Sequence, residues 1–248
     1  MRVVPIASSS KGNAYAVVGD GAVVLIDCGL TCKRVVECCC EKGIDLGALA
    51  GILITHDHSD HVGGLKVFLK RYDVKVYANL MTAEKLISEY AIDPQRFVCF
   101  ENGQPFEVAD FGVTAFSTPH DAVDSVGFFF ERGEATYFHA TDVGTPLDSI
   151  GRYLAKAETA VLESNHDPVL LRTSQRQESL KKRISGPRGH LSNDQAAELV
   201  RSFATPRLKR LMLAHLSEEC NAAHLAESTM REALASAGLG HVDLSIIQ

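Results

Sequence analysis

The chain has 248 residues, of which 46% are hydrophobic and 23% charged, and its formal net charge is −6 at pH 7. These values are typical of one globular domain with a substantial core, and they exclude a low-complexity chain. The acidic balance argues against a surface devoted to nucleic acid, although a local basic patch is compatible with it. No apolar run approaches the roughly 20 residues needed to cross a bilayer, so we expect no membrane partner.

The cysteines and the start of the chain predict a cytoplasmic protein. The seven cysteines include three adjacent ones at 38–40 and form no CxxC pair, which argues against a structural zinc site. We therefore expect free thiols in a reducing compartment, with two of the three packing a helix. The residues after Met1 lead directly into strand-like sequence and lack a cleavable signal pattern.

Taken in chain order, the predicted elements mix strands and helices. Strand-like runs near 2–7, 14–19 and 22–27 open the chain, and a helix is expected over 31–42. A strand at 51–54 precedes a further helical pattern, and a β-rich stretch covers about 105–141. The last third is expected to alternate helices and strands over 147–156, 160–163, 192–203, 208–214, 222–237 and 242–247. This mixture indicates a layered α/β architecture.

Residues 55–64, which read THDHSDHVGG, place four candidate metal ligands between a strand and a helix. Alternate residues of an extended chain point to the same side, so His56 and His58 can bind one ion together. Asp60 and His61 lie at the start of the helix and point elsewhere, which favours a second ion. Imidazole and carboxylate ligands suit zinc, manganese or iron. A solvated polar loop is the alternative, but chance rarely gives this density of ligands.

Four more polar residues follow apolar runs of strand type. They are Asp27, His120, Asp142 and His215. In this order, and with the HxHxDH motif after the first of them, they resemble the pattern of the metallo-β-lactamase superfamily. The resemblance implies a single domain over residues 1–248, folded as a four-layer αββα sandwich.

The same resemblance implies a centre of two divalent metal ions. One ion would be held by His56, His58 and His120, and the other by Asp60, His61 and His215. Asp142 would bridge the two ions. Asp27 would support the ligand loop with hydrogen bonds, although it could instead be an ordinary helix N-cap. Two divalent ions exceed the charge of their carboxylate ligands, so the centre favours an anionic phosphodiester.

Two further histidines are candidates for catalysis beside Asp60. His190 lies at an expected helix start, where Ser192 could cap the helix and backbone N–H groups favour a phosphate. His166 follows an apolar strand and precedes Pro168. For both histidines the alternative is a structural loop residue.

Residues 172–190 carry six basic side chains and one acidic one, a net charge of +5 in an acidic chain. This segment includes Lys182 and Arg183, and it ends at His190. It could be a solvated basic face of a helix. It could also follow a nucleic-acid backbone, because lysine and arginine supply most phosphate contacts.

Several motifs together resemble the YycJ/WalJ family of small bacterial proteins, which are regarded as DNA exonucleases. The matching segments are 8–14, 120–122, 163–167, 189–193 and 213–221. The resemblance implies a 5′ to 3′ DNA exonuclease. We expect its substrate to be bound by Ser9, Ser10, Asn13, Asn165, Lys182, Arg183, His190 and Ser192. One departure is that serine fills positions 8–10, where a glycine is usual near 8 or 9, which could change the freedom of φ.

Two other functions are compatible with this pattern. The first is hydrolysis of a small cyclic or nucleotide-like phosphodiester, as in relatives of PhnP, and the net charge of −6 favours it. The second is a non-catalytic regulatory partner built on a metal-binding fold. The complete ligand set argues against the second, because a non-catalytic protein has no need of open coordination at two metals.

Overall fold

The computed structural model describes residues 1–247. The described chain falls into two compact units. The first unit is Met1–Ala115 with Ala122–Ala135, and the second is Phe116–Asp121 with the chain from Thr136 onward. A single domain over residues 1–248 stays a prediction.

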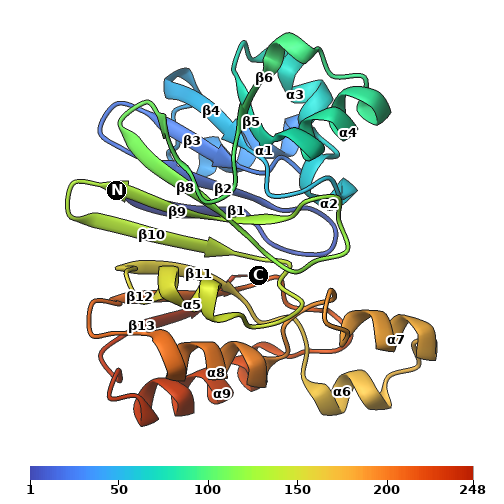
Figure 1. The fold of residues 1–248 in the computed structure, drawn as a ribbon, viewed down its shortest axis with the longest axis vertical. Helices are drawn as coiled ribbons and strands as arrows, with labels where there is room; N and C mark the ends of the chain where they lie inside the picture. Colours follow the sequence, from blue (N-terminus) through green and yellow to red (C-terminus); the bar gives the residue numbers. More distant parts are fainter. Residues whose placement is uncertain (248) are drawn as a thin grey trace. The chain divides into compact units, whose positions relative to one another are not determined.

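The first unit is built on a mixed sheet with the strand order β1-β2-β3-β4-β5-β6 (Figure 1). Its strands are β1 (Arg2–Ala7), β2 (Ala14–Val18), β3 (Val23–Ile26), β4 (Leu49–Leu53), β5 (Val76–Asn79) and β6 (Phe97–Phe100). Strands β1 to β3 pair antiparallel, and β3 to β6 pair parallel. The unit also holds β7 (Pro105–Val108), β8 (Phe111–Ser117) and β9 (Val126–Arg132), of which β7 and β8 form an antiparallel pair.

Apolar faces of helices cover this sheet. The helices are α1 (Cys32–Glu41), α2 (Ser59–Val62), α3 (Leu65–Arg71) and α4 (Leu80–Tyr90), with 3₁₀ turns at Leu46–Ala48 and Pro94–Arg96. Thr31 caps α1 by accepting a hydrogen bond from the Arg34 N–H. Val35 and Phe68 pack against Ile52 in one buried cluster, and each such side chain contributes about 1.5–3 kcal/mol. Cysteines 38 and 39 join this cluster as free thiols, as the sequence predicted.

The second unit contains a parallel sheet with the strand order β13-β12-β11-β10. Its strands are β10 (Ala135–Ala140), β11 (Thr159–Glu163), β12 (Arg210–Ala214) and β13 (Asp243–Ile246). The strands β10 to β12 are almost continuously buried, as expected for parallel strands. Because the strands run parallel, the carboxyl ends of β10, β11 and β12 meet at one edge, and the chain leaves that edge at Asp142, Glu163 and His215.

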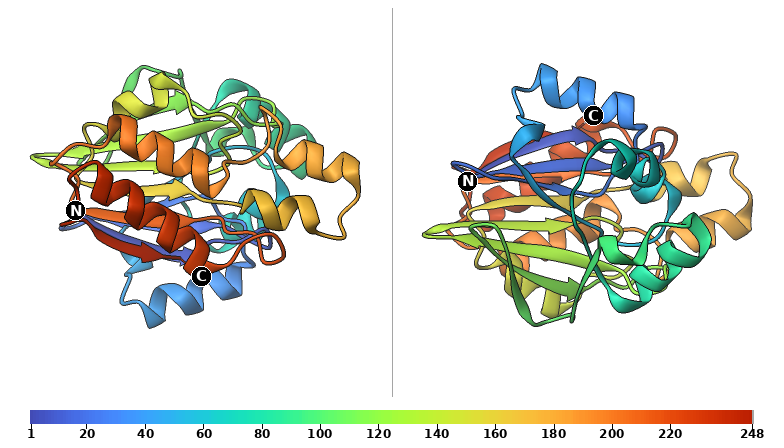
Figure 2. Two further views of the ribbon diagram at one scale, coloured as in Figure 1. Left: turned by 90° about the horizontal axis from the view of Figure 1, so that it is seen from below. Right: turned by 90° about the horizontal axis from the view of Figure 1, so that it is seen from above.

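Helices of the second unit are α5 (Asp148–Leu154), α6 (Pro168–Thr173), α7 (Glu178–Ile184), α8 (Asn193–Phe203) and α9 (Ala223–Ser236). Figure 2 shows α8 and α9 lying side by side. Helix α8 begins at a capping box, in which Ser192 accepts from the Gln195 N–H and the Gln195 side chain accepts from the Ser192 N–H. The bounds of the helices and strands that we expected in the last third of the chain agree with the structure to within about three residues. The short helices α6 and α7 were not predicted as elements. Within residues 1–247, no helix is long and apolar enough to cross a membrane.

Candidate metal centre

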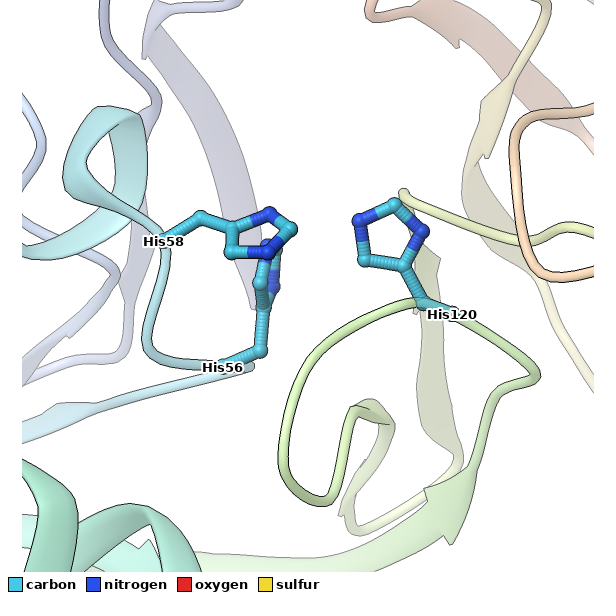
Figure 3. A group of neighbouring side chains, drawn as sticks. All are labelled: His56, His58 and His120. Atoms are coloured by element: carbon cyan, nitrogen blue, oxygen red, sulfur yellow. The ribbon is translucent and has the colours of Figure 1, made fainter. Parts of the chain in front are cut away.

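In the first unit, the HxHxDH motif lies on the loop after β4 and on α2. His56 and His58 come from the loop, and Figure 3 shows both rings projecting from it. His56 and His61 are fully buried, with ring centroids 4.1 Å apart. A Cβ at Gly29 would lie 1.6 Å from the Asp60 carbonyl oxygen, so only glycine allows this close approach to α2.

Asp27 fixes the orientation of His61. Its Oδ2 lies 2.7 Å from His61 Nδ1, and its two oxygens accept hydrogen bonds from the Thr55 N–H and hydroxyl, each at 2.8 Å. This pairing favours the tautomer with the proton on Nδ1, which leaves Nε2 as the nitrogen that could bind a metal ion. Burial raises the pKa of Asp27, while His61 and Thr55 oppose the rise. Asp27 therefore holds His61 through a buried contact, and Thr31 rather than Asp27 caps α1. Its support of a metal ligand stays a prediction.

Asn13 connects the early turn to the same motif. Its Nδ2 donates to the Ser9 carbonyl oxygen and to Asp60 Oδ2, and its backbone N–H donates to the Asp60 carbonyl oxygen. Ser9 accepts from the Lys11 N–H. Within residues 1–247, none of the three serines at positions 8–10 has a positive φ. Serine therefore fits at these positions without backbone strain.

In the second unit, Glu163 is a buried carboxylate at the end of β11. Its Oε1 lies 2.7 Å from His190 Nδ1 and 3.1 Å from His215 Nδ1. Its Oε2 accepts from the N–H groups of Val143 and Leu191. Burial alone would raise the pKa of Glu163, but the charge of His190 and the hydrogen bonds from both histidines lower it to about 2. No pattern in the sequence predicted this role for Glu163.

Asp142 lies among three histidines of the second unit. Its Oδ1 is 3.6 Å from His120 Nε2, from His190 Nδ1 and from His215 Nδ1. Ligand atoms of Asp142, Glu163, His190 and His215 all lie within 4.8 Å of one another. Buried nitrogen and carboxylate donors at this spacing fit a divalent metal ion.

The loop that carries His190 also orients His120. His120, drawn in Figure 3, has its Nδ1 2.9 Å from the Gly189 carbonyl oxygen. Arg188 donates from Nε to the His120 carbonyl oxygen. Burial, opposed by the charge of Asp142, lowers the pKa of His120, and the neutral ring is the form that binds a metal. For His190 the balance is the opposite. Burial alone would lower its pKa, but the carboxylate of Glu163 outweighs burial and raises the pKa.

Three residues that follow strand ends have a strained backbone. Asp27, Asp142 and His215 have φ of 61°, 58° and 59°, which is the left-handed region that side chains avoid. Each such conformation costs on the order of 1–3 kcal/mol and persists where the surroundings enforce it. All three follow a strand end, where the turn directs each side chain away from its strand.

The remaining predicted site residues have varied surroundings. Asn165 is buried and donates from Nδ2 to the His215 carbonyl oxygen. His166 is 2% exposed and forms an isolated β-bridge with Ser192. Arg183 donates from Nε to Asp121 at 2.5 Å. Their roles toward a substrate stay predictions.

The family is decided by comparison with known proteins. The family described as "Beta-lactamase superfamily domain" matches residues 23–216. The chain belongs to the metallo-β-lactamase superfamily. Exodeoxyribonuclease WalJ of Streptococcus pneumoniae serotype 2 (strain D39) is 34% identical over 238 residues, covering 95% of this chain and 88% of that protein. Exodeoxyribonuclease YycJ of Bacillus anthracis is also 34% identical over 238 residues, covering 95% of this chain and 89% of its own.

Solved structures agree on the fold. YhfI of Bacillus subtilis has a TM-score of 0.76 at 16% identity, covering 99% of this chain and 96% of its own. Zn²⁺-bound PqqB of Methylobacterium extorquens has a TM-score of 0.77 at 15% identity, covering 100% of this chain and 98% of its own. These similarities confirm the metallo-β-lactamase fold. With the family and the His/Asp clusters, the chain is a metal-dependent hydrolase related to exodeoxyribonucleases. The non-catalytic alternative is therefore wrong.

Proposed function

We propose that this hydrolase degrades DNA as a 5′ to 3′ exonuclease that uses two divalent metal ions. The observation that carries the proposal is 34% identity, over 95% of the chain, to proteins named exodeoxyribonucleases. The buried clusters of histidine and carboxylate side chains support it, because they fit hard or borderline divalent ions. All seven cysteines, which lie within residues 1–247, are free of disulfide bonds, and this favours a cytoplasmic location.

The proposed ligands are the residues that the HxHxDH motif and the superfamily resemblance predict. The first ion would be held by His56, His58 and His120, and the second by Asp60, His61 and His215. Asp142 would contact both. When bound, the two ions activate a water for attack and neutralise the charge of the phosphodiester. Asp27 contacts Nδ1 of His61, and Glu163 contacts Nδ1 of His215. Both contacts support the assignment, because they occupy Nδ1 and leave Nε2 of each histidine for the metal.

His190 is proposed to protonate the leaving oxygen. Its Nδ1 is held by Glu163 at 2.7 Å, which selects Nε2 as the nitrogen that faces a substrate. Its side chain is 22% exposed, whereas Glu163 is fully buried. A positioned histidine of this kind contributes about 10² to 10⁴ in rate.

The test is hydrolysis of DNA labelled at either end by the purified chain with Mn²⁺ or Zn²⁺, beside RNA and a bis-aryl phosphodiester. We expect mononucleotides to be released first from the 5′ end of DNA. Release from the 3′ end would contradict the direction alone. Hydrolysis of the small phosphodiester without any hydrolysis of DNA would contradict the exonuclease and favour the alternative that the acidic net charge suggests.

A further inference from the structure

A basic pocket lies beside the His190 loop, between the helices α6 and α7 of the second unit. These two short helices are neighbours in Figures 1 and 2. The pocket has a volume of about 290 Å³. Its lining consists of His166, Pro168, Leu171, Arg172, Glu178, Lys181, Lys182 and Ser185. We call it the α6–α7 pocket.

The α6–α7 pocket carries an excess of positive charge. Three cations and one carboxylate line it. Lys181 is committed to the walls, because its Nζ lies 3.0 Å from Glu178 Oε1 and donates to the Arg172 carbonyl oxygen at 2.9 Å. It thereby connects the end of α6 to the start of α7. Within residues 1–247, the side chains of Arg172 and Lys182 form no salt bridge, so their charges are available to a ligand.

His166 forms a buried part of the pocket wall. Its side chain is almost completely buried, and its Nδ1 has no hydrogen-bond partner within residues 1–247. A buried polar nitrogen without a partner is costly, so such atoms normally meet a water or a ligand. The backbone of His166 is fixed, since its carbonyl oxygen accepts from the Asn193 N–H at 2.9 Å. His166 is therefore a fixed part of the pocket wall.

The pocket adjoins the catalytic candidate His190. Ser185 lines the pocket, and the residue before it, Ile184, accepts a hydrogen bond from the His190 N–H at 2.8 Å. An anion in the pocket would therefore lie next to the loop that carries His190, the proposed proton donor.

We propose that the α6–α7 pocket binds a phosphate group of the DNA strand other than the scissile one. This inference rests on the proposed nuclease function and adds a subsite to it. Arg172 and Lys182 supply the charge, and His166 forms part of the wall. The phosphate can come from a terminal monophosphate or from an internal phosphodiester. Either source presents the same oxygens to the same groups.

The test compares Lys182→Glu with Lys33→Glu, which makes the same change of charge on an exposed helix of the first unit. Binding of short single-stranded DNA is measured by fluorescence anisotropy with the full chain in a chelator, with and without a 5′-phosphate. We expect Lys182→Glu to weaken binding about tenfold or more and Lys33→Glu to change it less than about twofold. A larger loss on the phosphorylated strand assigns the terminal phosphate, and equal losses assign an internal one. Equal effects of the two variants would overturn the proposal.

A second measurement separates this subsite from the nuclease function. Inorganic phosphate is added to the wild-type chain while the ring signals of His166 are followed by NMR. Shifted His166 signals in the wild type but not in Lys182→Glu support the subsite even if the chain fails to hydrolyse DNA. Unshifted signals in the wild type would overturn the subsite and leave the nuclease proposal standing.

Discussion

Both units of this protein use a buried carboxylate to orient a histidine, but the two carboxylates differ in how many groups they contact and how far apart in sequence those groups lie. In the first unit Asp27 contacts one histidine, His61, and also binds Thr55. In the second unit Glu163 contacts two histidines and two backbone N–H groups. The first arrangement is local, since His56 to His61 span six residues. The second brings together strand ends that are distant in sequence.

The second unit depends more on each single contact than the first unit does. Removal of Thr55 or Asp27 would disturb a loop that α2 also supports. Removal of Glu163 would release the two histidines and leave two backbone donors without a partner. Ligands drawn from separate strand ends have no neighbours in sequence to hold them, so the shared carboxylate carries their alignment.

The largest expected effect is that of Asp142→Ala, which removes the residue proposed to serve both metal ions. We expect metal content to fall from about two equivalents to less than about one, with DNA hydrolysis at background. Elemental analysis of reconstituted protein measures the content, and circular dichroism checks the fold. Full occupancy and activity in the variant would show that Asp142 does not bridge.

His190→Ala tests the part of the second unit that faces the substrate. We expect both metals to be retained and kcat on DNA to fall by about 10² to 10⁴, because the leaving oxygen loses its proton donor. The loss should shrink on a nitrophenyl phosphodiester, whose leaving group needs no proton. His224→Ala on the exposed side of α9 is the control. Equal losses on both substrates would indicate phosphate positioning in place of proton donation, and loss of metal would make His190 a ligand.

Glu163→Gln and Asp27→Asn compare the two carboxylates directly. Both variants keep the shape of the side chain and remove its charge. Partners of metal-binding histidines typically contribute 10- to 100-fold to metal affinity or activity. We expect about 100-fold for Glu163→Gln and about 10-fold for Asp27→Asn, measured as metal affinity by titration. The reverse order would contradict the difference drawn between the units.

The pH dependence of stability should differ in sign between the two carboxylates in metal-free protein. The pKa of Glu163 is lowered from 4.5 to about 2, so its contribution is present above pH 4.5 and is lost as the pH falls toward 2. The pKa of Asp27 is raised, so its contribution is present below its ordinary value and is lost as the pH rises through the folded value.

Chemical denaturation between pH 2.5 and 7 measures this contrast. Glu163→Gln should flatten the acid loss of stability, which we expect to be on the order of a few kcal/mol in the wild type. Asp27→Asn should reduce the decline in stability as the pH rises. An acid loss that is unchanged in Glu163→Gln would show that other groups cause it.

The sequence predicted the parts of the site that have a local pattern. HxHxDH is compact, and Asp27, Asp142 and His215 each follow an apolar run, so their positions at strand ends could be expected. The role of Glu163 could not, because it depends on the pairing of β10, β11 and β12 and on the path of the His190 loop. Without knowledge of that pairing, a glutamate after an apolar run indicates only that the strand ends there.

Two other features have no readable signal in the sequence. The left-handed φ of Asp142 and His215 is one, because Asp and His adopt this region more often than most side chains but far less readily than glycine. Helices α6 and α7 have six and seven residues. Helices that short rarely show an apolar period, so the pocket between them emerged only from the folded chain.

The most direct test of the account is anomalous X-ray diffraction at the metal edge from crystals of Mn²⁺- or Zn²⁺-reconstituted protein. The account predicts two peaks about 3.5–4 Å apart, with Asp142 in contact with both. The remaining ligands should divide between the peaks as His56, His58 and His120 on one and Asp60, His61 and His215 on the other. A single peak held only by residues of the second unit would contradict the two-metal centre. Those residues are Asp142, Glu163, His190 and His215.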